Sequence, residues 1–174
     1  MMGRLTVDSP LGPLTVTSAG GAVMALDWGR QGNGEGDDAP DAVLEEAARQ
    51  LDDYFVGRRT DFDLPLAPRG TVFRQKVWAA MQAIPYGQVL TYGDVARMLD
   101  SGPRAVGGAC GANPIPVIIP CHRIVGGGGS AGGYSGFGGL ETKGWLLRHE
   151  QRHRPTGRDV TGGKAGDTLE LQLT

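Results

Sequence analysis

The chain has 174 residues, of which 40% are hydrophobic and 21% charged, and these proportions are typical of a soluble globular protein with one or two small domains. Residues 1–14 contain no apolar stretch long enough for a signal peptide or a membrane span, so we expect a cytoplasmic protein with no membrane partner. Two cysteines and three histidines offer neither a disulfide framework nor the paired spacing of a structural zinc site, and we expect no bound metal.

The net charge of −2 conceals an uneven distribution along the chain. Residues 1–66 carry 5 basic and 12 acidic side chains, whereas residues 67–152 carry 9 basic and 4 acidic ones. A basic module joined to an acidic one is compatible with a polyanion that binds one side only. Chance partitioning in a small protein explains the same numbers, and the charge alone does not decide between the two.

The N-terminal part predicts a small antiparallel sheet with one helix. Three short stretches of alternating or β-branched residues, separated by turn residues, predict a β-meander: RLTVDS (4–9), LTVTSA (14–19) and AVMALDW (22–28). After a loop at 29–41, apolar residues recur at helical spacing over 43–55, which predicts an amphipathic helix that covers the sheet. Prolines punctuate residues 63–70, so we expect an extended segment and a domain boundary there.

The next part predicts three helices. Apolar residues at helical spacing begin after Thr71 and end at Pro85. Thr91 and Asp94 resemble a capping box, which predicts a second, short helix to about residue 99. After a tight turn, a third helix over 104–112 follows and is stopped by an Asn-Pro pair. Two short helices joined by a tight turn, with basic residues nearby, form a candidate helix-turn-helix.

The third helix is built almost entirely of small residues, with Arg104 as its one long side chain. Its three glycines (107, 108 and 111) each cost roughly 1 kcal/mol of helix stability relative to alanine. A close helix–helix contact would explain them. A close approach of DNA backbone, with one arginine inserted, would explain them equally well, and both interpretations stay open at this point.

The C-terminal part predicts a glycine-rich loop, a helix and a tail. Residues 126–139 form the loop, and a final helix spans about residues 140–152. Four residues lie on one face of that helix: Leu140, Lys143, Leu147 and Glu150. The two charged members must either face a polar partner or lie at the surface rim. Residues 153–174 contain few apolar side chains, and we expect them to be mostly disordered.

The segment IPVIIPCHRIVGG (115–127) places Cys121 directly beside His122 and Arg123. A cysteine is nucleophilic only as a thiolate, so it needs a base or a positive field nearby. Neighbouring residues on a strand point to opposite faces, so a turn or a bridging water must connect the Cys and the His. With Glu150 from the last helix, the sequence is compatible with a Cys–His–Glu relay. A buried, inert cysteine is the alternative.

Several blocks resemble the O6-alkylguanine-DNA alkyltransferase family. In chain order, which is also the family's order, they are FRQKVWAAMQAIPYGQVLTYGDVA, RAVGGACGANP, NPIPVIIPCHRIVG and GYSGFGGLETKGWLLRHE. The earlier stretch SPLGPLTVTSAGGAVMALDWG is similar to the ribonuclease-H-like part of bacterial members. The resemblance implies an α+β protein. A ribonuclease-H-like sheet with a helix would occupy residues 1–66, and a mainly helical, winged-helix-like (helix-turn-helix) alkyltransferase domain would occupy residues 67–152, followed by the tail at 153–174.

The resemblance implies DNA repair by irreversible, stoichiometric alkyl transfer without a cofactor. Cys121 would take the alkyl group from the O6 atom of guanine, and O4-alkylthymine is a second candidate substrate. His122, acting through a water and oriented by Glu150, would remove the thiol proton. Asn113 would fix the turn between the third helix and a strand that leads to the cysteine.

The partner implied by the resemblance is double-stranded DNA containing alkylated guanine, bound from its minor-groove side by a monomeric protein. Tyr92 would donate toward the guanine ring and help to rotate the nucleotide outward, and Arg104 would fill the gap left in the duplex. The remaining residues would contact the base, the pocket or the backbone: Gly107, Gly108, Ile124, Tyr134, Ser135 and Lys143.

Two other functions compete with alkyl transfer. A cysteine hydrolase would use the same Cys–His–Glu set but would need oxyanion-hole donors, which the sequence does not identify. A non-enzymatic relative that binds alkylated DNA would lack the cysteine, which is present here. The second thiol, Cys110, lies on the third helix, where we expect a packing role.

Overall fold

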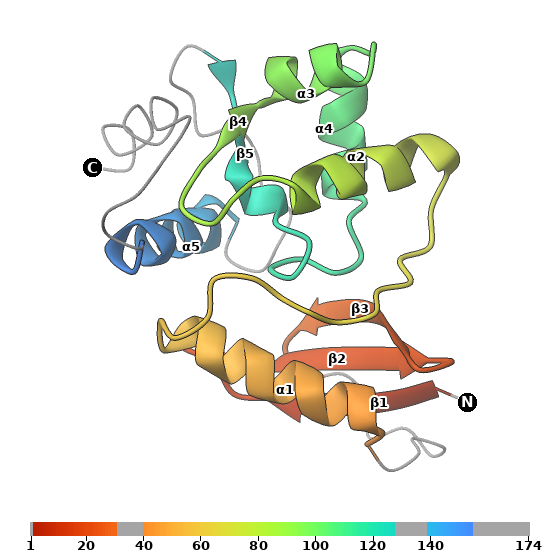
Figure 1. Ribbon diagram of the computed structural model, residues 1–174, viewed down its shortest axis with the longest axis vertical. Coiled ribbons are helices and arrows are strands. Elements are labelled where there is room, and N and C mark those ends of the chain that lie inside the picture. Colours follow the sequence, from red (N-terminus) through yellow and green to blue (C-terminus); the bar gives the residue numbers. More distant parts are fainter. Residues whose placement is uncertain (1, 31–39, 128–138, 155–174) are drawn as a thin grey trace. The chain divides into compact units, whose positions relative to one another are not determined.

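The computed structural model describes residues 2–30, 40–127 and 139–154 (Figure 1). The chain forms two compact units. The first comprises Met1–Arg69 together with Pro114–Ile118, and the second comprises Gly70–Asn113 together with Ile119–Thr174. In the described residues, no helix is long and apolar enough to cross a membrane.

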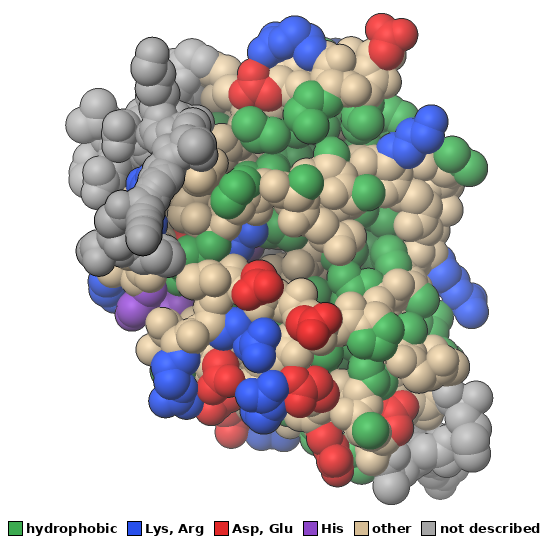
Figure 2. All heavy atoms as spheres, viewed as in Figure 1, with side chains coloured by type: hydrophobic (Ala, Val, Ile, Leu, Met, Phe, Trp, Pro, Cys, Tyr) green, Lys and Arg blue, Asp and Glu red, His purple; other side chains and the backbone are tan. Residues whose placement is uncertain are grey.

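The first unit is a three-stranded antiparallel sheet covered by one helix. Strands β1 (Met2–Val7), β2 (Leu14–Ala19) and β3 (Ala22–Trp28) lie in the order β1-β2-β3, and the helix α1 (Ala42–Phe55) packs on one face (Figure 1). This confirms the predicted meander and helix. Acidic and basic side chains alternate over the outer surface of α1 (Figure 2), where Arg49 pairs with Glu46 and Asp53.

Two segments from later in the chain complete the first unit. The extended segment predicted at 63–70 is confirmed in part, because Leu66 forms a parallel bridge with Val23 of β3. The backbone N–H of Leu26, also on β3, donates to the carbonyl of Pro114 over 2.9 Å. The sheet therefore uses backbone groups from residues 65–67 and from the segment 114–118.

The second unit contains four α-helices among its described residues. They are α2 (Val72–Gln82), α3 (Tyr92–Met98), α4 (Pro103–Gly111) and α5 (Leu140–Arg152), and a short parallel pair joins β4 (Leu90–Thr91) to β5 (Ile124–Val125). The predicted capping box is confirmed, because Thr91 accepts from the N–H of Asp94 and the Asp94 carboxylate accepts from the N–H of Thr91, both over 2.9 Å. Helices α3 and α4 pack against each other, as predicted for a helix-turn-helix.

A buried tryptophan fixes α4 against α2. The side chain of Trp78 is 1% exposed, and its indole N–H donates to the carbonyl of Ala109 over 2.8 Å. Val106 and Ala109 turn the inner face of α4 toward this core. The opposite face of α4 is consequently left to solvent at Ala105 and Gly108.

The predicted strand leading to Cys121 is wrong. Residues 114–120 form turns, and the cysteine opens a 3₁₀ turn, η1 (Cys121–Arg123). Pro114, Pro116 and Pro120 have no backbone N–H to donate to a strand ladder, and Val117 adopts a positive φ of 72°. Residues 114–120 have the hydropathy of a buried strand, but they cannot form its backbone hydrogen bonds.

Candidate active site

Cys121 is held in a buried turn by Asn113. The amide of Asn113 donates to the carbonyl of Ile119 over 2.9 Å, and the N–H of Cys121 donates to the same carbonyl over 2.8 Å. The side chain of Cys121 is 8% exposed. Burial raises the pKa of its thiol, although hydrogen bonds from the Asn113 side chain and from nearby backbone N–H groups favour the thiolate. The resting group is therefore a thiol, and a base must remove its proton.

His122 has the environment of such a base. Its Nε2 lies 2.7 Å from Oε2 of Glu150, and both side chains are at most 1% exposed. Burial lowers the pKa of the imidazole, so His122 is neutral and donates its Nε2–H to the carboxylate. The other ring nitrogen, Nδ1, is buried and has no hydrogen-bond partner among the described residues. Its lone pair is therefore open to accept a proton.

Glu150 remains ionised although it is 1% exposed. Burial acts to raise the pKa of its carboxyl, but His122 and Arg123 together hold that pKa well below its usual range. Arg123 donates to both carboxylate oxygens, from Nε over 2.8 Å and from Nη2 over 3.0 Å. Sequence reasoning placed Arg123 only as a nearby positive charge. The missed signal is that an arginine inside an apolar segment must find a buried counter-charge.

Lys143 and Glu150 do face polar partners, whereas Leu140 does not share their buried face. Lys143 is fully buried and donates to the carbonyl of Ile124 over 2.7 Å, with its ammonium 5.9 Å from the ring centre of Tyr92. Burial lowers the pKa of Lys143 to about 8. The backbone N–H of Ile124 donates to Cys121, so Lys143 supports the turn that carries the thiol. Leu140, the first residue of α5, is 55% exposed.

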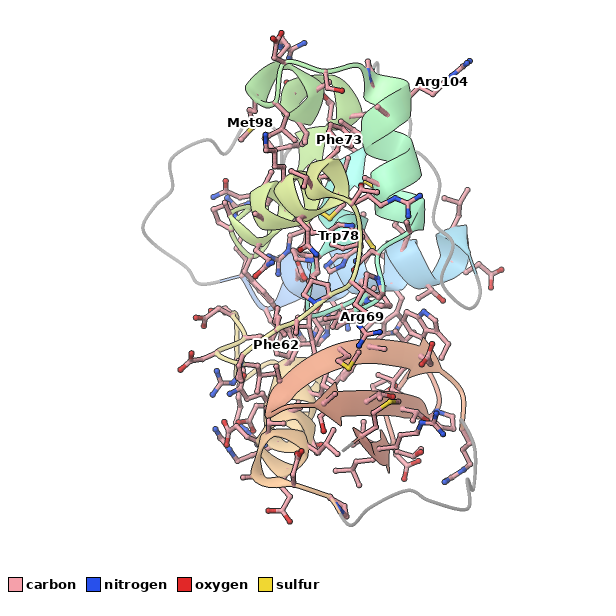
Figure 3. All side chains as sticks on the ribbon, turned by 90° about the vertical axis from the view of Figure 1, so that its right-hand side faces the viewer. Phe62, Arg69, Phe73, Trp78, Met98 and Arg104 are labelled. Carbon is pink, nitrogen blue, oxygen red and sulfur yellow. The ribbon has the colours of Figure 1, made fainter. Side chains whose placement is uncertain are left out.

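The glycines of α4 are not explained by a helix–helix contact. A Cβ added at Gly108 or Gly111 would meet no described atom within 4 Å, and one at Gly107 would meet only the ring of Tyr92, at 3.9 Å. Arg104 is exposed and extends from the start of α4 (Figure 3). The structure thus leaves a shallow, small-residue face with a single long cation at its beginning.

The last candidates from the sequence are two residues of the glycine-rich loop and the second cysteine. Tyr134 and Ser135 lie outside the described residues. Cys110 is half-buried on α4, and burial raises the pKa of its thiol to about 12, so at neutral pH this thiol stays protonated. Both cysteines are free thiols, and in the described part of the chain no group of three or more His, Cys, Asp or Glu side chains could hold a metal.

Two family models match nearly the whole described chain. Residues 72–152 match the 6-O-methylguanine DNA methyltransferase, DNA binding domain, and residues 3–68 match the 6-O-methylguanine DNA methyltransferase, ribonuclease-like domain.

Relatives with these domains occur in several bacteria. The chain is 40% identical over 155 residues to the methylated-DNA–protein-cysteine methyltransferase of Mycolicibacterium paratuberculosis, which covers 86% of this chain and 93% of the relative. It is 38% identical over 157 residues to the constitutive enzyme of that name from Bacillus subtilis, with 84% and 93% covered. Among solved structures, Mycobacterium tuberculosis OGT in complex with DNA is similar, with a TM-score of 0.76, 38% identity and 97% and 99% of the two chains covered.

The buried ion network predicts a large cost for Glu150→Gln. Arg123 would keep its buried charge without a counter-charge, so the free energy of unfolding at pH 7 should fall by roughly 3–5 kcal/mol, measured by urea unfolding. Because the folded-state pKa of Glu150 is depressed, its stabilisation is present above the ordinary pKa and is lost as acid protonates the folded carboxyl. The matched control Glu141→Gln, exposed on the same helix, should cost less than about 1 kcal/mol. Equal losses would contradict this account.

Proposed function

We propose, for a chain that belongs to the 6-O-methylguanine DNA methyltransferase family, that Cys121 is the residue that accepts the alkyl group. The protein is a DNA-repair alkyltransferase that moves this group from methylated DNA to a cysteine of its own chain. The observation that carries the assignment to Cys121 is the neighbouring His122, whose Nε2 is bonded to Glu150 while Nδ1 is open as an acceptor. Burial raises the pKa of both thiols, but Cys110 lies on α4 and has no histidine beside it in the chain.

The proposed reaction begins with proton transfer. A water carries the thiol proton of Cys121 to Nδ1 of His122, and Glu150 holds the ring in the tautomer that accepts it. The sulfur then forms a bond to the alkyl carbon, while the bond between that carbon and O6 breaks. Its electron pair returns to the guanine, whose O6 becomes a carbonyl and whose ring gains one proton in place of the one lost by the thiol. Tyr92 is the proposed donor toward the ring.

Each molecule acts once. A thioether is a poor leaving group, so the alkylated Cys121 is not regenerated, and the reaction needs no cofactor because the protein itself is the acceptor. The buried thiol has a raised pKa, so its proton must be removed before or during the attack.

DNA would approach α4 from the minor-groove side. The open faces at Gly107 and Gly108 allow a backbone to come close, and the exposed Arg104 is long enough to enter the stack. A base inside the duplex is out of reach of Cys121, so the nucleotide must be extruded at a cost of a few kcal/mol. Contacts to phosphates would supply affinity without sequence preference.

The remaining pocket assignments are proposals of the same kind. The carbonyl of Ile124 already accepts from Lys143 and has a second lone pair for the flipped base. Tyr134 and Ser135 would line the pocket and hydrogen-bond the base. We propose that the protein acts as a monomer and, because its substrate is DNA, in the cytoplasm.

A single mass measurement separates alkyl transfer from its two competitors. After incubation with a duplex containing O6-methylguanine, the intact protein should gain one methyl group, located on Cys121 by peptide mapping, and Cys121→Ala should gain none. Turnover of acyl substrates with no adduct would favour a hydrolase. Unmodified protein that still binds the lesion would favour a non-enzymatic binder.

Arg104→Ala should separate extrusion from chemistry. Since Arg104 is proposed to stabilise the duplex after the base leaves it, repair of methylated duplex should slow by roughly tenfold or more, about 1.4 kcal/mol. The rate with free O6-benzylguanine, which requires no extrusion, should change much less. An equal loss with both substrates would refute the role in flipping.

Gly108→Leu should separate stability from DNA binding. Leucine favours helix over glycine by up to about 1 kcal/mol and meets no protein atom here, so the melting temperature should not fall. If α4 lies close to DNA, the larger side chain should weaken duplex binding by about tenfold or more, measured by fluorescence anisotropy. Gly108→Ala is the milder partner variant. Unchanged affinity in both variants would place the DNA elsewhere.

A further inference from the structure

Arg123 is buried directly behind the residues proposed to act on the thiol. Its side chain is 8% exposed, and its guanidinium makes three hydrogen bonds to protein atoms: two to the carboxylate of Glu150 and one, from Nη1 over 2.7 Å, to the carbonyl of Ile84. Its central carbon also lies 5.7 Å from the ring centre of Tyr86. Burying this charge costs several kcal/mol before its partners compensate, so its retention calls for a reason beyond packing.

The guanidinium sets the direction of the Glu150 carboxylate. Oε1 accepts from Nε of Arg123 and, at 3.3 Å, from the N–H of Gly87, while Oε2 accepts from Nη2 of Arg123 and from His122. A bidentate arginine leaves a carboxylate little freedom to rotate. The oxygen that meets His122 is thus oriented by Arg123, and the imidazole must donate through Nε2.

Arg123 also balances the charge that His122 experiences. The charged or titratable groups around His122 are Glu150 and Lys143 from α5 and Cys121 and Arg123 from its own turn, with Tyr86 beside the Arg123–Glu150 pair. Glu150 favours protonation of the imidazole, and the two cations oppose it. Arg123, Glu150 and a neutral His122 together carry no net charge, and Lys143 adds one positive charge nearby. Without Arg123, an imidazolium would be the remaining counter-charge for the carboxylate.

We propose that Arg123 is a positioning residue that keeps His122 neutral and in its Nε2–H tautomer, and that it thereby sets the lowest pH at which the thiol can be deprotonated. This inference rests on the proposed role of Cys121 and His122. It adds a third residue, which sets the protonation state and the tautomer of His122. Lys143 contributes to the same balance, and its ammonium donates to the carbonyl of Ile124.

The test is the pH profile of single-turnover methyl transfer with saturating O6-methylguanine duplex. In Arg123→Met the His122–Glu150 pair should take up a proton more readily, so the acidic midpoint of the rate should rise by about one pH unit, which corresponds to an approximately tenfold slower reaction on the acidic limb. Rates should converge with wild type at high pH. Arg123→Lys keeps the charge and should move the midpoint less while lowering the plateau, because it cannot form the two-point contact.

The control and the overturning outcomes are separate from those of the proposed function. Arg148→Met removes an exposed arginine from α5 and should leave the midpoint unchanged. A uniformly slower Arg123→Met with an unmoved midpoint would show a structural role only and overturn the proposal. Wild-type protein that transfers no methyl group at any pH would instead overturn the proposed function.

A measurement on the wild-type protein covers the case in which Arg123→Met fails to fold. Nitrogen-15 spectra of the histidine side chains should show His122 at pH 7 with a proton on Nε2 and none on Nδ1. An imidazolium, or the opposite tautomer, at that pH would overturn the proposal directly.

Discussion

The buried carboxylate of Glu150 is the constraint on which the rest of the active site depends. It accepts hydrogen bonds from His122, from two nitrogens of Arg123 and from the N–H of Gly87, so α5, η1 and the loop after α2 all meet at one group. An ion network of this kind contributes little net stability compared with an apolar core, but breaking it is costly. The network therefore specifies how α5, η1 and the loop after α2 are arranged. Because Cys121 opens η1, this arrangement also fixes the position of its thiol.

The Cys121 thiol is buried, and the side chains around it are already fixed in position. Burial raises the pKa of the Cys121 thiol and favours its protonated form, while Asn113 and the proline-rich turn fix where the sulfur lies. The imidazole of His122, the proposed base, is already oriented, with Nε2 bonded to Glu150 and Nδ1 open. On the face of α4 proposed to meet DNA, the packing of Trp78 on Ala109 turns the glycines outward. Core packing and the small-residue face are thus two sides of the same helix.

Local signals in the sequence predicted the regular elements well. The strands at 14–19 and 22–28, the helix at 140–152 and the capping box at Thr91 all match, because strand alternation, helical spacing and caps involve residues close in the chain. The failures had non-local or hydrogen-bonding causes. The apolar run before Cys121 has the hydropathy of a strand, yet its prolines cannot donate. The role of Arg123 depends on a carboxylate 27 residues away. The choice between two explanations for Gly108 needed the space around it, which no sequence pattern contains.

The placement of residues 114–118 has a consequence for how the chain can be divided. These residues belong to the first unit, although Asn113 before them and Ile119 after them belong to the second. The two units are interleaved in sequence, because each is made of two separate stretches of the chain. A fragment that begins after residue 69 would carry Ile115, Val117 and Ile118 without the β3 edge that binds Pro114, and would expose side chains that are at most 5% accessible in the whole chain. The segment that leads to Cys121 therefore takes part of its hydrogen bonding and burial from the first unit, and a cut after residue 69 would remove both.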